Sequence, residues 1–227
     1  MWKSGKPSAR IARTESPPHV GSCRDDDRWP VDPTLYVRRF RPERTSHRPV
    51  TEVRLLYDDM ALYGLFCVQD RYVRCVREGL QVPVCRDSCV ELFVQPGGRG
   101  GYFNFEFNCG GAALASYITD QRRTPDGFAD FARLSVAECR RIELGHTLDG
   151  PIDPEIEHPL DWALACRIPF GLIESYSGVP PPRPGVVWRG NAYKCGDETS
   201  HPHWAAWSPV PELNFHDPQA FGDLLFD

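Results

Sequence analysis

Alternation of hydrophobic and polar residues recurs along most of the chain and predicts β-strands, because successive side chains in a strand point to opposite faces. Residues 50–57 and 62–68 are two such runs on either side of Asp58-Asp59, which predicts a β-hairpin. Further strands are expected over residues 88–95, 102–108, 112–118, 162–168, 186–194 and 223–226. A short helix is expected after Pro169 and one helical turn after Asp217. The pattern therefore predicts an all-β protein with short helical turns.

Two polar or proline-rich stretches, residues 120–127 and 151–159, are expected to be loops. Residues 1–22 are rich in Lys, Arg, Ser and Pro and poor in large apolar side chains, which favours a disordered N-terminal tail. The remaining residues, 23–227, are enough for one β-rich domain with a sizeable core. We therefore expect a tail followed by a single domain.

Charge and hydropathy narrow the classes of partner. The chain has 26 Lys and Arg against 31 Asp and Glu, a net charge of −5, without a sustained basic run, so a nucleic-acid partner is not expected. No apolar run approaches eighteen residues, and the N-terminus lacks the apolar core of a signal peptide, so the sequence as written predicts a cytoplasmic protein without a membrane partner. Secretion stays open if the start is misassigned. The oligomeric state is left open.

The nine cysteines are an odd number dispersed over expected strands, which is typical of buried free thiols rather than of a disulfide framework. Cys85 and Cys89 have the spacing C-x-x-x-C. They lack the second pair or the suitably spaced histidine of a zinc site. Whether these two cysteines pair with each other is left open, and no metal ligand is identified.

Two expected strands carry polar residues that a ligand could use. In residues 88–95, Glu91 shares a face with Cys89 and Phe93, so its carboxylate either has a protein partner or accepts hydrogen bonds from a ligand. In residues 102–108, three phenylalanines point inward, and the other face bears Asn104, Glu106 and Asn108. That face suits hydroxyl recognition and equally suits a solvated sheet surface.

Residues 188–207 combine three tryptophans with polar side chains, among them Arg189 and Asn191 on one face of the expected strand. A sugar ring needs such a mixture, because its C–H faces pack on aromatic rings and its hydroxyls need donors and acceptors. The alternative is that these tryptophans belong to the core of the domain.

Several strings in order resemble the carbohydrate-binding module family 9 superfamily, in particular its family 9-like bacterial proteins. The strings are Leu-Tyr-Asp-Asp at 56–59, Asp-Ser-Cys-Val-Glu-Leu-Phe-Val at 87–94, Tyr-Phe-Asn-Phe-Glu-Phe-Asn at 102–108, Asn-Ala-Tyr-Lys-Cys-Gly-Asp at 191–197 and Asp-Pro-Gln-Ala-Phe-Gly at 217–222. The resemblance implies a single β-sandwich of two antiparallel sheets. It also implies an accessory module of glycoside hydrolases that serves carbohydrate catabolism and binds sugar chain ends between aromatic plates without catalysis.

The resemblance carries over to particular residues. The glutamate of the Val-Glu-Leu-Phe strand is Glu91, the hydroxyl-binding groups correspond to Glu106 and Asn191, and the second aromatic plate is Phe215. The first plate, a tryptophan in the family, falls near Cys85, so Trp204 or Trp188 would have to replace it. The predicted ligand-binding residues are Glu91, Asn104, Glu106, Arg189, Asn191, Trp204 and Phe215.

No cofactor is expected, although the resemblance allows a structural calcium ion with oxygens from Asp58-Asp59 or from residues 25–27.

Three hypotheses about function follow. The first is a noncatalytic domain that binds a mono- or oligosaccharide. The second is a glycoside-processing enzyme that uses Glu91 with Glu106, or else a cluster of residues close together in the sequence. That cluster consists of Lys194, Cys195, Asp197, His201 and His203. The third is an interaction domain without a small ligand, whose aromatic side chains would be buried against their neighbours.

Overall fold

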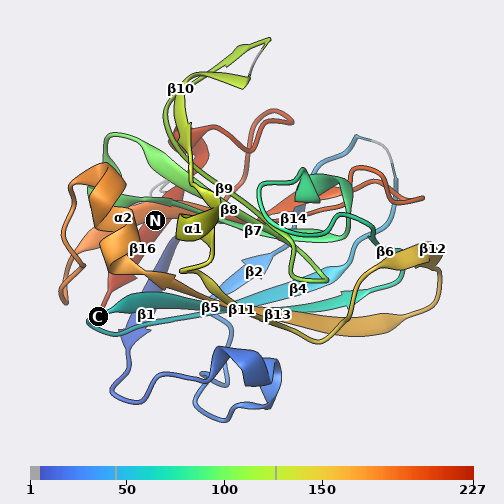
Figure 1. The fold of residues 1–227 in the computed structure, drawn as a ribbon, viewed down its shortest axis with the longest axis horizontal. Coiled ribbons are helices and arrows are strands. Elements are labelled where there is room, and N and C mark those ends of the chain that lie inside the picture. The colour runs from blue at the N-terminus through green and yellow to red at the C-terminus, as the bar shows by residue number, and fades with distance from the viewer. Residues whose placement is uncertain (1–5, 44, 126) are drawn as a thin grey trace, which may run out of the picture.

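The computed structural model describes residues 6–43, 45–125 and 127–227 and consists mainly of two β-sheets packed face to face (Figure 1). Neighbouring strands within each sheet run antiparallel, apart from the pairings of one N-terminal strand. The prediction of an all-β protein built as an antiparallel β-sandwich is therefore confirmed.

The first sheet is the upper layer of Figure 1. Its strands are β3 (Arg39–Phe40), β7 (Cys89–Gln95), β8 (Tyr102–Asn108), β9 (Ala113–Thr124), β10 (Gly127–Arg133), β14 (Val187–Cys195), β15 (Trp204–Ala206) and β16 (Gly222–Phe226). The main order is β10-β9-β8-β7-β14-β16, and β15 pairs with both β14 and β3.

The second sheet is the lower layer. Its strands are β2 (Leu35–Val37), β4 (Val50–Tyr57), β5 (Ala61–Asp70), β11 (Glu143–His146) and β13 (Leu160–Pro169). The order is β4-β5-β13-β11, and β2 pairs with β4. The predicted hairpin is β4–β5, in which Tyr57 pairs with Leu62 across the turn.

Short helices and 3-10 turns lie between the strands. The helices are α1 (Val136–Cys139) and α2 (Phe170–Ser177), and the 3-10 turns are η1 (Val20–Asp25), η2 (Val84–Arg86), η3 (Pro96–Gly98) and η4 (Pro218–Ala220). The helix expected after Pro169 is α2, and the turn expected after Asp217 is η4, whose first turn Asp217 caps. A separate two-stranded sheet joins β6 (Val73–Cys75) to β12 (Ile152–Ile156), so the loop expected over residues 151–159 contains a strand.

The prediction of a disordered tail over residues 1–22 is wrong where the structure describes that segment, and its first five residues lie outside the described ranges. Strand β1 (Ser8–Arg13) pairs in parallel with β16 at Ser8–Ile11 and with β4 at Ala12 and Arg13, so it links the two sheets. Its side chains alternate, and Ile11 is fully buried. The composition of the segment misled the prediction, because two buried residues, Ala9 and Ile11, are enough to dock a short strand between partner strands.

The core lies between the sheets. Val90, Leu92 and Phe105 of the first sheet pack against residues of the second sheet such as Phe66 and Trp162. This follows from the period of two, which places every second residue of each strand in the interior. Seven of the nine cysteines are buried and all nine are free thiols, as the dispersed spacing predicted.

Additional segments cover the outer faces of both sheets. Residues 20–29 lie against the outer face of the second sheet, where Trp29 is buried and donates a hydrogen bond from Nε1 to the carbonyl of Cys23 (2.9 Å). On the outer face of the first sheet, Phe93 and Tyr193 lie under Val210 and Phe221. The part of that face left uncovered forms the candidate site.

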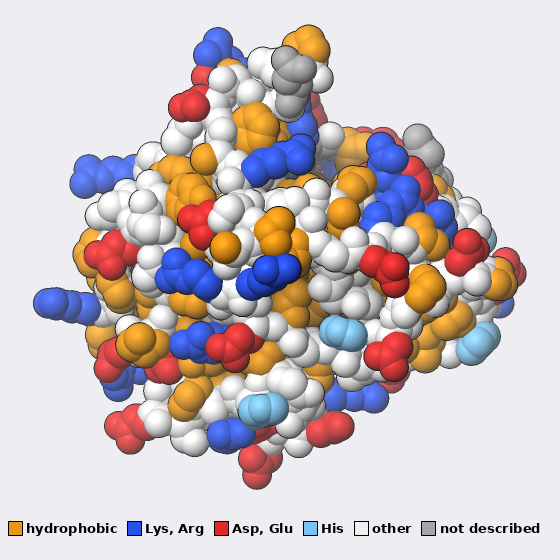
Figure 2. Space-filling view, in the orientation of Figure 1, with side chains coloured by type: hydrophobic (Ala, Val, Ile, Leu, Met, Phe, Trp, Pro, Cys, Tyr) orange, Lys and Arg blue, Asp and Glu red, His pale blue; other side chains and the backbone are white. Residues whose placement is uncertain are grey.

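The β9–β10 hairpin projects from the sandwich (Figure 1), where residues 120–127 were expected to be a loop. The prediction is wrong because β9 continues to Thr124 and turns into β10, so polar side chains continue the ladder beyond the core. Basic and acidic side chains are interspersed on the face shown in Figure 2. Within the described residues, no helix combines the length and the apolar character needed to span a lipid bilayer.

Candidate functional site

A cleft lies on the outer face of the first sheet, over strands β7, β8 and β14. Its volume is about 300 Å³, at the lower end of the ~300–1,000 Å³ that is typical of small-molecule sites. The lining residues come from segments far apart in the sequence: Cys85, Glu91, Glu106, Arg123, Cys195, Asp197, Trp204, Leu213, Asn214, Phe215 and His216. They comprise three carboxyl groups, two thiols, two large aromatic rings and one guanidinium.

The floor of the cleft carries Glu91 and Glu106. These residues are directly opposed on β7 and β8, so their side chains point to the same face of the sheet. Glu106 Oε1 accepts a hydrogen bond from Asn104 Nδ2 at 2.7 Å, and Glu91 Oε1 accepts one from the thiol of Cys195 at 3.1 Å. Burial raises the pKa of Glu106 to about 7, and burial together with the charge of Glu106 raises the pKa of Glu91 well above its usual value.

The third carboxyl group belongs to Asp197, in the loop after β14. It accepts a hydrogen bond at 2.7 Å from the indole nitrogen of Trp204, which ties the carboxyl to the ring beside it. Burial raises the pKa of Asp197, and the bonds from Trp204 and Cys85 oppose that shift. An aromatic face and a hydrogen-bond acceptor therefore sit side by side in this wall.

The other aromatic wall is Phe215. Its ring stacks on Tyr193 with centroids 4.0 Å apart, and the hydroxyl of Tyr193 donates to the carbonyl of Phe215 at 2.9 Å. The neighbouring His216 is hydrogen-bonded through Nδ1 to the hydroxyl of Tyr102, and burial lowers its pKa to about 3, so its imidazole is neutral. Phe215 is thus held by the sheet beneath it.

A cation lies at the rim of the cleft. Arg123 is an exposed residue of the β9–β10 hairpin, and its guanidinium stacks on Phe128 at 4.2 Å from the ring centroid. The sequence did not predict a role for Arg123, because residues 120–127 were expected to form a loop. The strand pairing that places Arg123 beside the cleft joins mostly polar residues, which show little of the hydrophobic alternation that predicts a strand.

Four of the seven predicted ligand-binding residues line the cleft: Glu91, Glu106, Trp204 and Phe215. Asn104 lies beneath and positions Glu106. The other two are used inside the protein. Asn191 is buried and bonds to both the amide and the carbonyl of Ser208, and Arg189 donates to the carbonyls of Pro218 and Phe221.

Either Trp188 or Trp204 was expected to supply the first aromatic plate, and the structure places one of the two in the cleft. Trp188 is fully buried in the core between Phe170 and Phe226. Trp204 lines the cleft, as does Cys85, near which the first plate was expected to fall.

The residue cluster considered for catalysis is divided by the sheet, because adjacent residues of a strand point to opposite faces. Cys195 and Asp197 face the cleft, whereas the side chain of Lys194 is fully buried on the core side. There its ammonium lies 2.8 Å from Nε2 of His203 and 3.3 Å from Asp70. Residues that are close together in the sequence therefore lie on opposite faces of the sheet.

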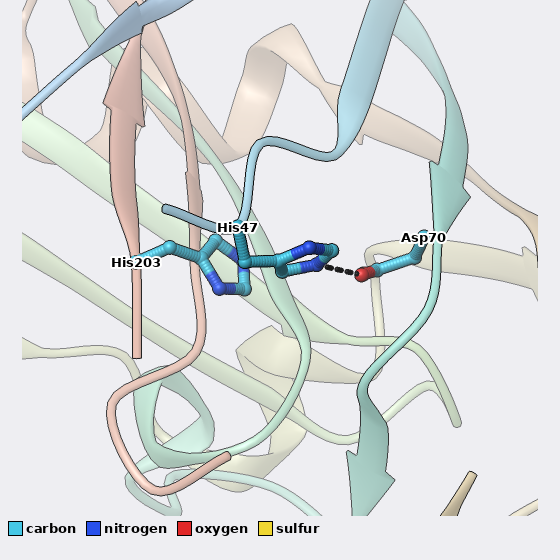
Figure 3. Close-up of side chains that lie close together, drawn as sticks. All are labelled: His47, Asp70 and His203. Atoms are coloured by element: carbon cyan, nitrogen blue, oxygen red, sulfur yellow. Dashed lines mark hydrogen bonds and ion pairs between the residues drawn. The ribbon is translucent and has the colours of Figure 1, made fainter. Parts of the chain in front are cut away.

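Figure 3 shows His203 beside His47 and Asp70, whose carboxylate is bonded to His47 at 2.7 Å. Burial lowers the pKa of His203 to about 3, so its neutral Nε2 accepts a hydrogen bond from Lys194. Burial alone would raise the pKa of Asp70, but the charge of Lys194 and the bond from His47 hold it below its usual value. The group is a buried ion-pair network between the sheets.

Asp58 and Asp26, one from each of the two segments considered for calcium, are engaged in turns. Asp58 accepts hydrogen bonds from the amides of Met60 and Ala61, and Asp26 accepts one from the amide of His19 and pairs with Arg28. A calcium site needs six to eight converging oxygens. These bonds instead satisfy the local turns, which does not fit a calcium ion at either place.

Comparisons with known proteins agree with this architecture. The family model described as "Carbohydrate-binding family 9" matches residues 36–226, a range that includes every residue lining the cleft. No curated protein matches the sequence.

Two solved proteins share the fold. A candidate carbohydrate-binding protein from Bacteroides uniformis is 26% identical with a TM-score of 0.83, over 98% of this chain and 100% of that one. A carbohydrate binding module of family 9 from Caldicellulosiruptor kristjanssonii is 12% identical with a TM-score of 0.63, in complexes with glucose and with cellotriose. These two matches cover 97% of this chain and 96% and 93% of those chains, and at such identity they show the fold alone.

Proposed function

The chain belongs to carbohydrate-binding family 9, and from this premise we propose that its cleft binds a mono- or oligosaccharide without changing it chemically. The observation that carries the proposal is the combination of buried carboxyl groups, Glu91 and Glu106, with the rings of Trp204 and Phe215 in the walls of one cleft. Glucose and cello-oligosaccharides are the first ligands to test, because the family 9 module from Caldicellulosiruptor kristjanssonii was solved with glucose and with cellotriose.

The chemistry of the cleft suits a pyranose. Its rings offer apolar surfaces to the C–H faces of the sugar, and the carboxyl oxygens of Glu91, Glu106 and Asp197 can accept hydrogen bonds from hydroxyls. A hydrogen bond to an ionised carboxylate contributes more than one between neutral groups. The volume of about 300 Å³ suits one or two sugar units rather than a long chain.

The arrangement of the two glutamates supports binding rather than hydrolysis. A glycosidase places its two carboxyl groups on either side of the scissile bond. Glu91 and Glu106 rise from neighbouring strands of one sheet face, so both approach a ligand from below. The other catalytic candidate, a Cys–His pair, is not supported either, because Cys195 and His203 contact different partners on opposite faces of β14.

The proposal is tested by calorimetric titration of the full chain with glucose, cellobiose, cellotriose, galactose and glucuronic acid. Phe215→Ala and Trp204→Ala are each expected to weaken binding roughly tenfold, the equivalent of about 1.4 kcal/mol of lost ring contact. Tyr36→Ala is the matched control, because Tyr36 is an exposed ring on the other sheet. The proposal would be contradicted if the wild-type protein bound none of these sugars, or if Tyr36→Ala weakened binding as much as the two cleft variants.

A nitrophenyl glycoside assay on the same preparation separates binding from catalysis. We expect no release of nitrophenol above the buffer rate. Turnover that disappears in Glu91→Gln or Glu106→Gln would instead make the protein a glycosidase.

A further inference from the structure

Two thiols and a carboxyl group meet at the floor of the cleft. Cys89 and Cys195 are directly opposed on β7 and β14, and Glu91 lies two residues after Cys89 on the same face of β7. The two Sγ atoms and a carboxylate oxygen of Glu91 all lie within 4.8 Å of one another. Cys195 and Glu91 line the cleft, so the group can be reached from solvent through it.

We propose that Cys89, Cys195 and Glu91 form a binding site for one thiophilic divalent cation of the Zn²⁺ type. Zinc takes thiolate and carboxylate ligands at about 2.3 and 2.0–2.2 Å in a tetrahedral arrangement, which sets its ligand atoms roughly 3.5–3.8 Å apart. The observed separations need adjustments on the order of 1 Å to reach that geometry. Three ligands and one open position are the arrangement of zinc sites that admit a further group, and here that position faces the cleft.

Metal binding at this site is coupled to the loss of protons from its ligands, because zinc binds thiolate and carboxylate rather than the protonated groups. A divalent ion replaces their protons, so its binding is expected to release protons and to strengthen as the pH rises.

The other group with metal-ligand chemistry, His47, Asp70 and His203, does not carry the same inference (Figure 3). The ammonium of Lys194 already lies against Asp70 and His203 and compensates the buried carboxylate. A metal ion there would have to displace a buried lysine. At the cysteine site the lysine points to the opposite face of the same strand.

The sequence could not predict this site. Cys85 and Cys89 were the pair considered for zinc, whereas the pairing of β7 with β14 brings in Cys195 from 106 residues away. Glu91 belongs to both the metal site and the proposed sugar site, but metal uptake is measured without sugar, so failure of either proposal is distinguishable from failure of the other.

The test is a titration of the reduced, metal-free full chain with Co²⁺ and then Zn²⁺, followed by absorption. We expect thiolate-to-cobalt charge-transfer bands that saturate at one ion per chain and disappear on addition of Zn²⁺. A chromophoric chelator in competition gives the zinc affinity. Cys89→Ser, Cys195→Ser and Glu91→Gln are each expected to weaken it at least tenfold, since even the loss of a residue behind the ligands costs about 10–100-fold.

Cys67→Ser is the matched control, because Cys67 is a partly buried thiol on the second sheet. It is expected to bind the metal like the wild-type protein. Circular dichroism confirms that each variant is folded, and Glu91→Gln keeps both thiols if a serine variant fails to fold. Absence of thiolate bands in the reduced wild-type protein, or an equal loss of affinity in Cys67→Ser, would overturn the proposal. Formation of a Cys89–Cys195 disulfide that persists under reducing conditions would overturn it as well.

Discussion

Glu91 and Glu106 are directly opposed on neighbouring strands and share the floor of one cleft, where 3% and 6% of their surfaces are exposed. Two carboxyl groups this close and this buried cannot both ionise without a large electrostatic cost. The cleft therefore combines a proposed ligand site with a source of pH-dependent stability.

The first prediction concerns that pH dependence. Burial raises the pKa of Glu106 to about 7 from 4.5, so the folded protein holds this proton more tightly than the unfolded chain does. Its stabilising contribution is complete below pH 4.5 and is lost as the pH rises through about 7. At 1.36 kcal/mol per pKa unit, the loss in unfolding free energy is roughly 3 kcal/mol. Urea unfolding measured at several pH values checks this change.

Glu106→Gln should flatten this part of the profile, because glutamine stays neutral throughout. Glu143→Gln serves as the control, since Glu143 is exposed on the second sheet and pairs with Arg167. Profiles of wild type and Glu106→Gln that run parallel between pH 4.5 and 8 would contradict the assignment.

Local strand alternation was enough to predict much of this site. The side-chain direction of Glu91 and Glu106 depends on the period of two within their own strands, and the structure confirms both directions. The same rule separates Lys194 from Cys195, since adjacent residues of a strand point to opposite faces. The hypothesis of a catalytic cluster grouped them because they are neighbours in the sequence.

Strand pairing over long distances could not be read from the chain. The parallel pairing of β1 with β16 joins Ser8 to Asp223, and the pairing of β14 with β7 joins Cys195 to Cys89. Neither pairing has a local signature, because strand order is set by how whole sheets close over the core. The sequence therefore predicted the β-sandwich and part of the cleft, but missed Arg123 and the thiol group.

The second prediction concerns the ion pair between the sheets. The side chains of Asp70 and Lys194 are fully buried and 3.3 Å apart. Asp70→Asn should lower the unfolding free energy by about 3–5 kcal/mol, because the ammonium would stay buried without its counter-charge. Adding Lys194→Met should recover part of that loss. Denaturant unfolding of the single and double variants measures the coupling.

Asp120→Asn provides the comparison, since Asp120 pairs with an arginine at the surface and its loss should leave the unfolding free energy almost unchanged. If Asp70→Asn were as mild as this surface variant, the buried pair would have no structural role.

The third prediction tests whether the N-terminal strand belongs to the domain. Ile11 is fully buried in β1, so Ile11→Ala should cost about 2–4 kcal/mol of unfolding free energy through lost burial and the cavity left behind. Its neighbour Arg10 points outward, and Arg10→Ala should cost less than about 1 kcal/mol. Thermal and urea unfolding compare the two. If both substitutions left the unfolding free energy unchanged, the disordered tail expected from the composition would be the better description of this segment.

The last prediction uses two glycines with opposite surroundings. An added Cβ at Gly145 of β11 would overlap the carbonyl oxygen of Val20, where the segment 20–29 crosses the sheet. Gly145→Ala should therefore cost about 1–3 kcal/mol, since backbone cannot move aside as a side chain does. An added Cβ at Gly171 in α2 would meet Arg141 at 3.7 Å, an ordinary contact.

Gly171→Ala should therefore stabilise the protein by roughly 0.5–1 kcal/mol through the helical preference of alanine. Urea unfolding of the two variants measures a loss of stability for Gly145→Ala and a gain for Gly171→Ala. Sugar affinity should stay unchanged in both, because neither glycine lines the cleft. A Gly145→Ala variant as stable as the wild-type protein would mean that residues 20–29 do not pack on the second sheet as described.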